Sequence, residues 1–224
     1  MPPTRKTTQT VYEKLAAHYG RPAATHPSGH PMNVLVETIL SQHTSDKNSH
    51  RAFVQLRKQF PSWQQVLDAP TKAVEEAIRS GGLAKQKSAR IQQVLREIRA
   101  REGRISLARL RRLDTKEIYD YLTALPGIGD KTACCVLLFA WGRAVMPVDT
   151  HIHRIIKRLG WIPQQAPPEA ARAAVESRLP MESLYHMHVL LIAHGRETCK
   201  AQRPQCGICP IRRHCPSSRM GGTR

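Results

Sequence analysis

Apolar side chains recur at helical spacing along most of the chain. In "THIHRIIKRLG", residues 150–160, they return every three to four positions until a glycine ends the pattern. Alternating β-branched runs are few, and the sequence contains no Asn-Gly or Asp-Gly hairpin turn. We therefore predict an all-α fold, with helices over residues 8–18, 33–40, 47–59, 63–69, 71–80, 87–101, 115–124, 130–141, 150–159, 168–178 and 183–194.

The segment "LPGIGDKTA", residues 125–133, joins two of these predicted helices through a turn rich in glycine. The pattern predicts a helix-hairpin-helix in which Asp130 begins the second helix. Gly127 and Gly129 lack side chains, so backbone amides at the positive end of that helix can face a phosphate. An ordinary tight connection between two helices is the alternative interpretation.

The chain is strongly basic, which favours a polyanionic partner such as nucleic acid. Its 224 residues include 35 Lys plus Arg and 17 Asp plus Glu, for a formal net charge of +18. Basic residues are dense over residues 79–112, where a solvated helix face is the alternative interpretation. The sequence has no apolar run long enough to span a bilayer and no apolar core of a secretory signal. We therefore expect no membrane partner and a cytoplasmic location, associated with the nucleoid if the source is prokaryotic.

Two residues that follow the predicted turn suggest chemistry on a sugar. Lys131 falls in the first turn of its helix, where the positive end of the helix dipole disfavours a protonated amine. An unprotonated amine forms Schiff bases with carbonyl-like carbons, and C1′ of a deoxyribose losing its base is one. Asp149 precedes another predicted helix and could stabilise an oxocarbenium-like sugar and transfer protons. Phosphate binding by Lys131 and helix capping by Asp149 are the alternatives.

Four cysteines close to the C-terminal end of the sequence have the spacing of metal ligands, C-x6-C-x2-C-x5-C. Such short spacers let four thiolates converge on one centre, which suits either a zinc ion or an iron-sulfur cluster. Two disulfides, or a lone redox C-x-x-C, are weaker alternatives in a cytosolic chain. Cys134 and Cys135 belong to an apolar helix and are expected to be packing residues. The predicted metal ligands are Cys199, Cys206, Cys209 and Cys215.

Together "LPGIGDKTA", "VDTHIHR" and the four-cysteine loop resemble the endonuclease III family of helix-hairpin-helix DNA glycosylases. The resemblance covers nearly the whole chain. It implies a two-lobed, all-helical fold with a six-helix barrel over residues 31–143. Residues 1–30 and 144–224 would form the second lobe, and its loop at 199–215 would hold a 4Fe-4S cluster. DNA would lie between the lobes.

The resemblance also assigns roles to single residues. Lys131 matches the Schiff-base lysine, Asp149 the catalytic aspartate, and the four cysteines match the cluster ligands. Gly127 and Gly129 match the hairpin glycines that bind DNA. The remaining DNA-binding residues expected here are Gln42 and His43, which would fill the space of a flipped base, Leu83, which would enter the base stack, and Lys200, Arg203, Arg212 and Arg213, which would contact phosphates around the cluster.

The implied enzyme is a bifunctional DNA N-glycosylase and AP lyase of base excision repair. It would excise oxidised pyrimidines from duplex DNA through a Schiff base on Lys131 and cut the strand by β-elimination. Its partner would be double-stranded DNA with damaged bases or abasic sites, and we expect a monomer. The alternatives are a monofunctional glycosylase and an iron-sulfur DNA-binding module without catalysis. Lys131 argues against both.

Overall fold

The computed structural model describes residues 3–23 and 29–220 of the chain. Within these ranges all regular secondary structure is helical and there is no β-strand, which confirms the predicted fold class. No helix in the described ranges has both the length and the apolar character that crossing a membrane requires.

The chain divides into two compact units, Pro27–Arg143 on the one hand and Met1–His26 with Ala144–Arg224 on the other. They are called the hairpin unit and the cluster unit below, after the motif that each contains. The domain bounds expected from the sequence stay a prediction, with His30 assigned here to the hairpin unit. Each unit is described separately.

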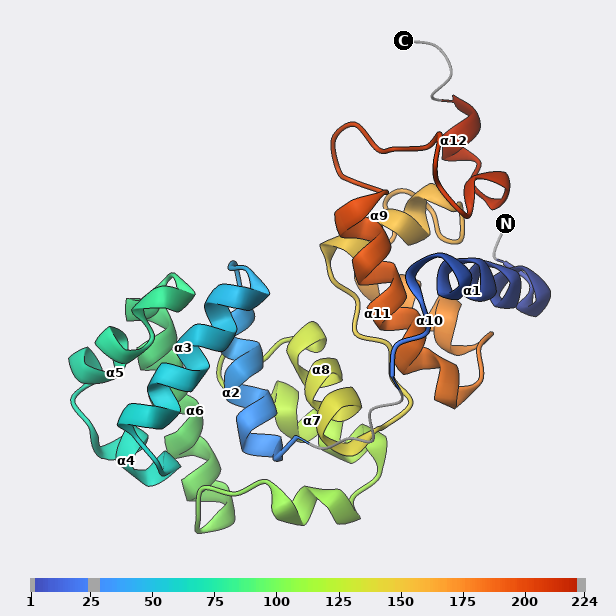
Figure 1. The fold of residues 1–224 in the computed structure, drawn as a ribbon. Helices are drawn as coiled ribbons and strands as arrows, with labels where there is room; N and C mark the ends of the chain where they lie inside the picture. The colour runs from blue at the N-terminus through green and yellow to red at the C-terminus, as the bar shows by residue number, and fades with distance from the viewer. Residues whose placement is uncertain (1–2, 24–28, 221–224) are drawn as a thin grey trace. The chain divides into compact units, whose positions relative to one another are not determined.

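The hairpin unit is built around one helix that is apolar on most of its surface. Leu35, Val36 and Ile39 on this helix, α2, have no exposed surface, as expected for a helix with neighbours on several sides. It lies between α3 and α8 and packs against both (Figure 1). The helices of this unit are α2 (Pro31–Ser41), α3 (Asp46–Gln59), α4 (Trp63–Asp68), α5 (Thr71–Ala77), η1 (Arg79–Gly81), α6 (Ala84–Glu102), η2 (Ala108–Arg112), α7 (Thr115–Thr123) and α8 (Asp130–Trp141).

The predicted helix over residues 71–80 is wrong in its last three residues. The α-helix ends at Ala77, a 3-10 turn follows, and the chain then passes through two left-handed residues, Gly82 at φ 68° and Leu83 at φ 49°. Left-handed backbone cannot continue a right-handed helix. The next helix therefore starts at Ala84, earlier than the predicted start at residue 87.

The cluster unit has its own apolar core, formed by helices from both ends of the chain. Leu15 of α1, Ile155 of α9 and Leu191 of α11 are buried in one hydrophobic cluster. Helix α11 packs against both α1 and α9. The helices of this unit are α1 (Arg5–Tyr19), α9 (Thr150–Arg158), α10 (Pro168–Glu176), α11 (Met181–Glu197), η3 (Arg212–His214) and α12 (Ser217–Met220).

Candidate active site and candidate metal centre

The predicted helix-hairpin-helix is present as α7, a tight turn and α8, which pack against each other. The turn closes with a hydrogen bond from the amide of Ile128 to the carbonyl of Leu125 at 3.1 Å. Gly127 has φ 69°, in the left-handed region that glycine adopts without steric cost. The hydroxyl of Tyr119 on α7 donates to Oδ1 of Asp130 at 2.8 Å, which ties the first helix to the start of the second.

The start of α8 has the features of an anion site. Its N-cap is Gly129, and no side chain caps the helix, so the amides of the first turn have no partner within the helix. Gly129 is exposed, and a Cβ placed on it would meet nothing within 4 Å. Free amides, the positive end of a helix dipole and open space are the features of an anion site.

Lys131 is the second residue of α8, as the sequence predicted. It is half-buried, and its Nζ makes no hydrogen bond or ion pair with any described residue. The next residue, Thr132, accepts a hydrogen bond at 3.4 Å from Nε2 of Gln42. The structure thus joins the end of α2, where Gln42 lies, to the helical turn that carries Lys131.

Three of the predicted DNA-binding residues line one pocket in the hairpin unit: Gln42, His43 and Leu83. Leu83 is 48% exposed and is one of four large hydrophobic side chains that are exposed among the described residues. Leu83 and His43 both adopt left-handed backbone, at φ 49° and 52°. Each such conformation costs on the order of 1–3 kcal/mol for a residue other than glycine, and this kind of strain gathers at functional sites.

A buried lysine that the sequence analysis did not single out connects the two loops at this pocket. Lys87 is 4% exposed, and its Nζ donates to the carbonyls of Leu40 at 2.6 Å and Gly81 at 2.8 Å. Burial lowers the pKa of Lys87. Leu40 lies two residues before Gln42, and Gly81 two before Leu83, so one ammonium holds both loops. The interpretation of the whole basic run at 79–112 as a surface is therefore wrong at Lys87.

Asp149 caps α9 in the cluster unit. Its Oδ1 accepts a hydrogen bond from the amide of Ile152 at 2.8 Å, which confirms the capping interpretation. It is half-buried, and the other carboxylate oxygen accepts no hydrogen bond from the described residues. Lys131 and Asp149 belong to different units, so their action on one sugar stays a prediction.

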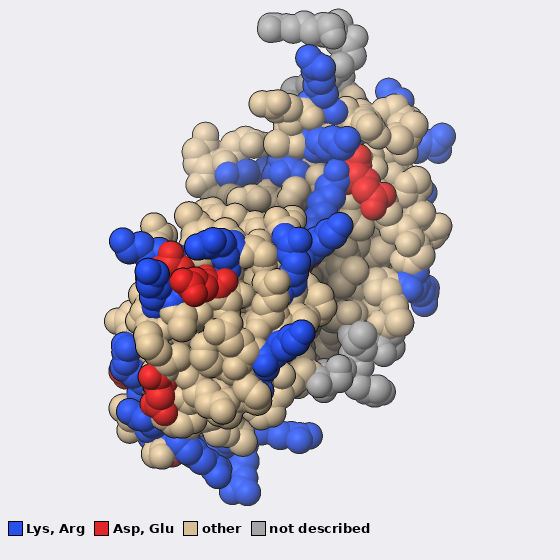
Figure 2. Space-filling model, turned by 60° about the vertical axis from the view of Figure 1, so that its left-hand side comes forward, with Lys and Arg blue, Asp and Glu red and all other residues tan. Residues whose placement is uncertain are grey.

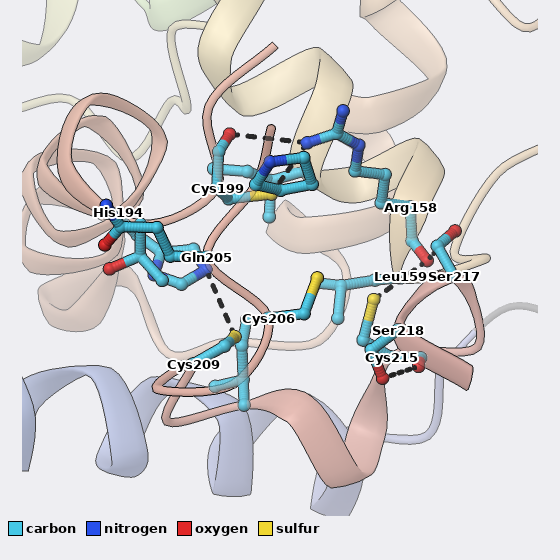
Figure 3. A pocket seen from close by; sticks show the side chains of 14 residues that line it. Arg158, Leu159, His194, Cys199, Gln205, Cys206, Cys209, Cys215, Ser217 and Ser218 are labelled. Carbon is cyan, nitrogen blue, oxygen red and sulfur yellow. Dashed lines mark hydrogen bonds between the residues drawn. The ribbon is translucent and has the colours of Figure 1, made fainter. Parts of the chain in front are cut away.

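The four predicted metal ligands line a single pocket in the cluster unit (Figure 3). None of them is in a disulfide; all are free thiols. This arrangement excludes the two-disulfide alternative and leaves no cysteine of the motif unexplained. The cysteines that line this pocket are Cys199, Cys206, Cys209 and Cys215.

The four thiols that line the pocket fit an iron-sulfur cluster. Burial raises the pKa of Cys209 to about 11 and also raises that of Cys215, so their thiolates need a bound cation. A zinc ion would need all four sulfurs about 2.3 Å from one point. An iron-sulfur cluster instead takes each thiolate on a different iron, which suits thiols that line a wider space.

Arginine and histidine side chains surround the thiols, and the sequence motifs gave no signal for them. Arg158 donates to Sγ of Cys199 at 3.2 Å (Figure 3). It also donates to the carbonyl of Lys200 at 2.7 Å. Nε2 of His194 lies 3.7 Å from Sγ of Cys209. Burial lowers the pKa of His194 to about 4, so this imidazole is neutral. Such contacts orient ligands and tune a metal centre.

The basic side chains predicted to contact phosphates around the cluster are at the surface. Lys200, Arg203, Arg212 and Arg213 are all exposed. Figure 2 shows Lys and Arg spread over the face in view, with few Asp or Glu among them. The placement is compatible with phosphate contact but equally with a solvated surface, so the assignment stays a prediction.

Known proteins resemble this chain over most of its length. Residues 36–181 match the family described as HhH-GPD superfamily base excision DNA repair protein, and residues 199–215 match the iron-sulfur binding domain of endonuclease III. The second match confirms the iron-sulfur prediction for the four-cysteine loop.

Two relatives and one solved structure illustrate the likeness. Endonuclease III of Sulfolobus acidocaldarius is 36% identical over 183 residues, which cover 81% of this chain and 79% of that protein. A protein of Arabidopsis thaliana named as a DNA glycosylase is 39% identical over 186 residues, 79% of this chain. The chain spans 64% of the length of that plant protein. A trapped covalent intermediate of endonuclease III with DNA matches with a TM-score of 0.83 and 26% identity, over 97% of this chain and 98% of that one.

Proposed function

The chain belongs to the endonuclease III family of base excision repair DNA glycosylases, and we propose that it is a bifunctional member that excises oxidised pyrimidines from duplex DNA and cuts the strand. The observation that carries the proposal is Lys131. Its amine stands in the first turn of α8, free of hydrogen bonds and ion pairs with the described residues, beside amides suited to a phosphate. A phosphate held there would place a sugar within reach of the amine.

The proposed reaction uses the Lys131 amine as nucleophile. Nζ forms a bond to C1′ of the sugar while the glycosidic bond breaks, and the bonding electrons leave with the base. Loss of the Nζ proton and ring opening give an imine. Removal of a C2′ proton then expels the 3′ phosphate by β-elimination, which cuts the strand on the 3′ side. We assign to Asp149 the stabilisation of positive charge on the sugar and proton transfer, using the carboxylate oxygen that does not cap α9.

Base flipping is assigned to the pocket that Gln42, His43 and Leu83 line. An exposed leucine in a strained conformation is suited to entering the base stack, where burial of its side chain offsets the cost of unstacking. Gln42 and His43 would fill the space that the flipped base leaves. A damaged base costs less to unstack than an intact one, which favours the lesion.

Duplex DNA is the proposed partner, held through its phosphates. The net charge of +18 and the uncapped start of α8 support this, and the matched endonuclease III structure is itself a DNA complex. We propose that the chain acts as a monomer, and in the cytoplasm, at the nucleoid if the source is prokaryotic. The free cysteines support a reducing compartment.

The four thiols would hold a 4Fe-4S cluster, whose bonds to them would cross-link the loop. We propose that the ordered loop presents basic side chains to phosphates and takes no part in bond chemistry. A variant with Ala at Lys200, Arg212 and Arg213 should then bind DNA more weakly. Its salt slope, which is the slope of the logarithm of the binding constant against the logarithm of the salt concentration, should fall by about 3 in magnitude. Unchanged affinity and slope would contradict this role.

The reaction is tested by the products from a duplex that carries thymine glycol. A bifunctional enzyme releases the base and leaves a strand cut on the 3′ side of the lesion. A monofunctional glycosylase releases the base but leaves the abasic strand intact until alkali is added. A binding module retains the duplex and releases nothing. Only the first outcome agrees with the proposal.

A further inference from the structure

Arg90 on α6 covers the turn of the hairpin. The end of its side chain, Nη1 and Cζ, lies where a Cβ on Gly127 would stand. The guanidinium therefore occupies the space that any side chain at position 127 would need. Gly127 has a left-handed φ of 69°, which favours glycine, and its missing side chain leaves room for the guanidinium.

The guanidinium has no partner in the part of the chain that the structure describes. Arg90 is half-buried, yet it makes no hydrogen bond or ion pair with a described residue. Other arginines in the same region are paired: Arg101 donates to Glu97 at 2.7 Å and Arg109 donates to Glu102 at 2.8 Å. The five donors of this guanidinium are therefore available to an anion.

Arg90 also lines the pocket that contains the proposed base-flipping residues, among them Gln42 and Leu83. The Arg90 side chain thus lies at the hairpin turn and also borders the pocket that Leu83 lines. The start of α8, which no side chain caps, follows the turn by two residues. An anion bound by the amides there would lie next to the guanidinium.

We propose that Arg90 binds a DNA backbone phosphate together with the hairpin amides, at the nucleotide beside the one that is flipped. Guanidinium and phosphate match in geometry and form paired, charge-assisted hydrogen bonds. This contact couples the hairpin, which holds the DNA backbone, to Leu83, which enters the base stack. The inference rests on the proposed function, because it needs duplex DNA as the ligand.

The test measures binding of the full chain to a duplex with a tetrahydrofuran abasic analogue, between about 50 and 200 mM salt. Arg90→Met keeps most of the side-chain volume and removes the charge. It should weaken binding about tenfold and lower the salt slope by about 0.9, the value for one phosphate. Arg90→Lys should keep the slope. Arg96→Met is the matched control, since Arg96 is an exposed residue of the same helix with no described partner, and it should change neither.

A packing role predicts a different result. If Arg90 only covers Gly127, Arg90→Met lowers the melting temperature while affinity and slope stay those of the native chain, which overturns the inference. If the native chain also cuts a thymine glycol duplex in that case, the proposed function survives without it. A native chain that binds no duplex overturns both.

Discussion

The hairpin and the cluster loop are held in place by different means. Around the hairpin, Leu122, Leu125 and Ile128 are buried, and α8 carries Lys131 on a helix that is apolar almost throughout. Over residues 199–215, all of them described, Ile211 is the one buried apolar side chain. Apolar packing can order the first region, whereas the second has too little apolar surface to order itself.

The two regions are therefore kept ordered by different interactions. In the hairpin unit it comes from the core and from a few polar contacts such as those of Lys87. In the cluster loop it must come from the metal centre and from two arginines. Arg154 donates to the carbonyl of Cys199, and Arg158 donates to the carbonyls of Lys200 and Ala201. Loss of a ligand should therefore affect one region and spare the other.

The largest expected effect is that of Cys209→Ala. Loss of a cluster ligand should abolish iron binding and destabilise the cluster unit by about 4 kcal/mol or more. Cys135→Ala is the control, because it removes a buried thiol of the hairpin unit that binds no metal, and it should cost about 1 kcal/mol with full iron content. Iron analysis and hydrogen exchange of both regions measure this. Faster hydrogen exchange in α8 as well as in the cluster loop would contradict the claim that the two regions are ordered independently.

A smaller effect is expected from Lys87→Met. The change leaves two buried carbonyls without their donor, at a cost of about 2–3 kcal/mol. Exchange of amides around Gln42 and Leu83 should rise, and iron content should stay unchanged. Lys85→Met, at an exposed position of the same helix, should leave the unfolding free energy within about 0.5 kcal/mol. Equal effects of the two variants would show that Lys87 does not join the loops.

The smallest effect on folding is expected from Gly129→Ala. The residue has ordinary extended backbone and open space around its Cβ, so stability should change by less than about 0.5 kcal/mol. The new methyl group would stand where a phosphate meets the amides of α8. Affinity for an abasic duplex should fall about tenfold, the loss of one charge-assisted contact.

Gly207→Ala gives the same change in the cluster loop, at another glycine with open space. It should leave affinity near that of the native chain. Melting curves and binding isotherms of both variants make the comparison. Equal losses of affinity would mean that the hairpin is not a distinct phosphate site.

Local patterns predicted the features that depend on neighbours in sequence. Helical periodicity gave the all-α fold, "LPGIGDKTA" gave the hairpin, cysteine spacing gave the metal loop, and the position of Asp149 gave its cap. These features arise from backbone and side-chain preferences within a few residues. The position of Lys131 in its helix suggested a Schiff base, and the family resemblance supported that role and added the role of Leu83. Both roles still await experiment.

Contacts between distant segments were not predictable in this way. Nothing in a run of basic residues distinguishes buried Lys87 from exposed Arg96, because the difference lies in which carbonyls the fold places beside each one. The approach of Arg90 to Gly127 and of Arg158 to Cys199 likewise depends on how helices pack. The helix predicted over 71–80 failed for a related reason, since tertiary packing, not periodicity, sets the turn at Leu83.

Borohydride trapping on a duplex with an abasic site tests the central claim most directly, with the native chain and Lys131→Ala compared at full iron content. The account predicts a covalent DNA adduct with the native chain and none with the variant, because reduction fixes the imine between C1′ and Nζ of Lys131. No adduct from native protein that binds the duplex, or an equal adduct from Lys131→Ala, would contradict it.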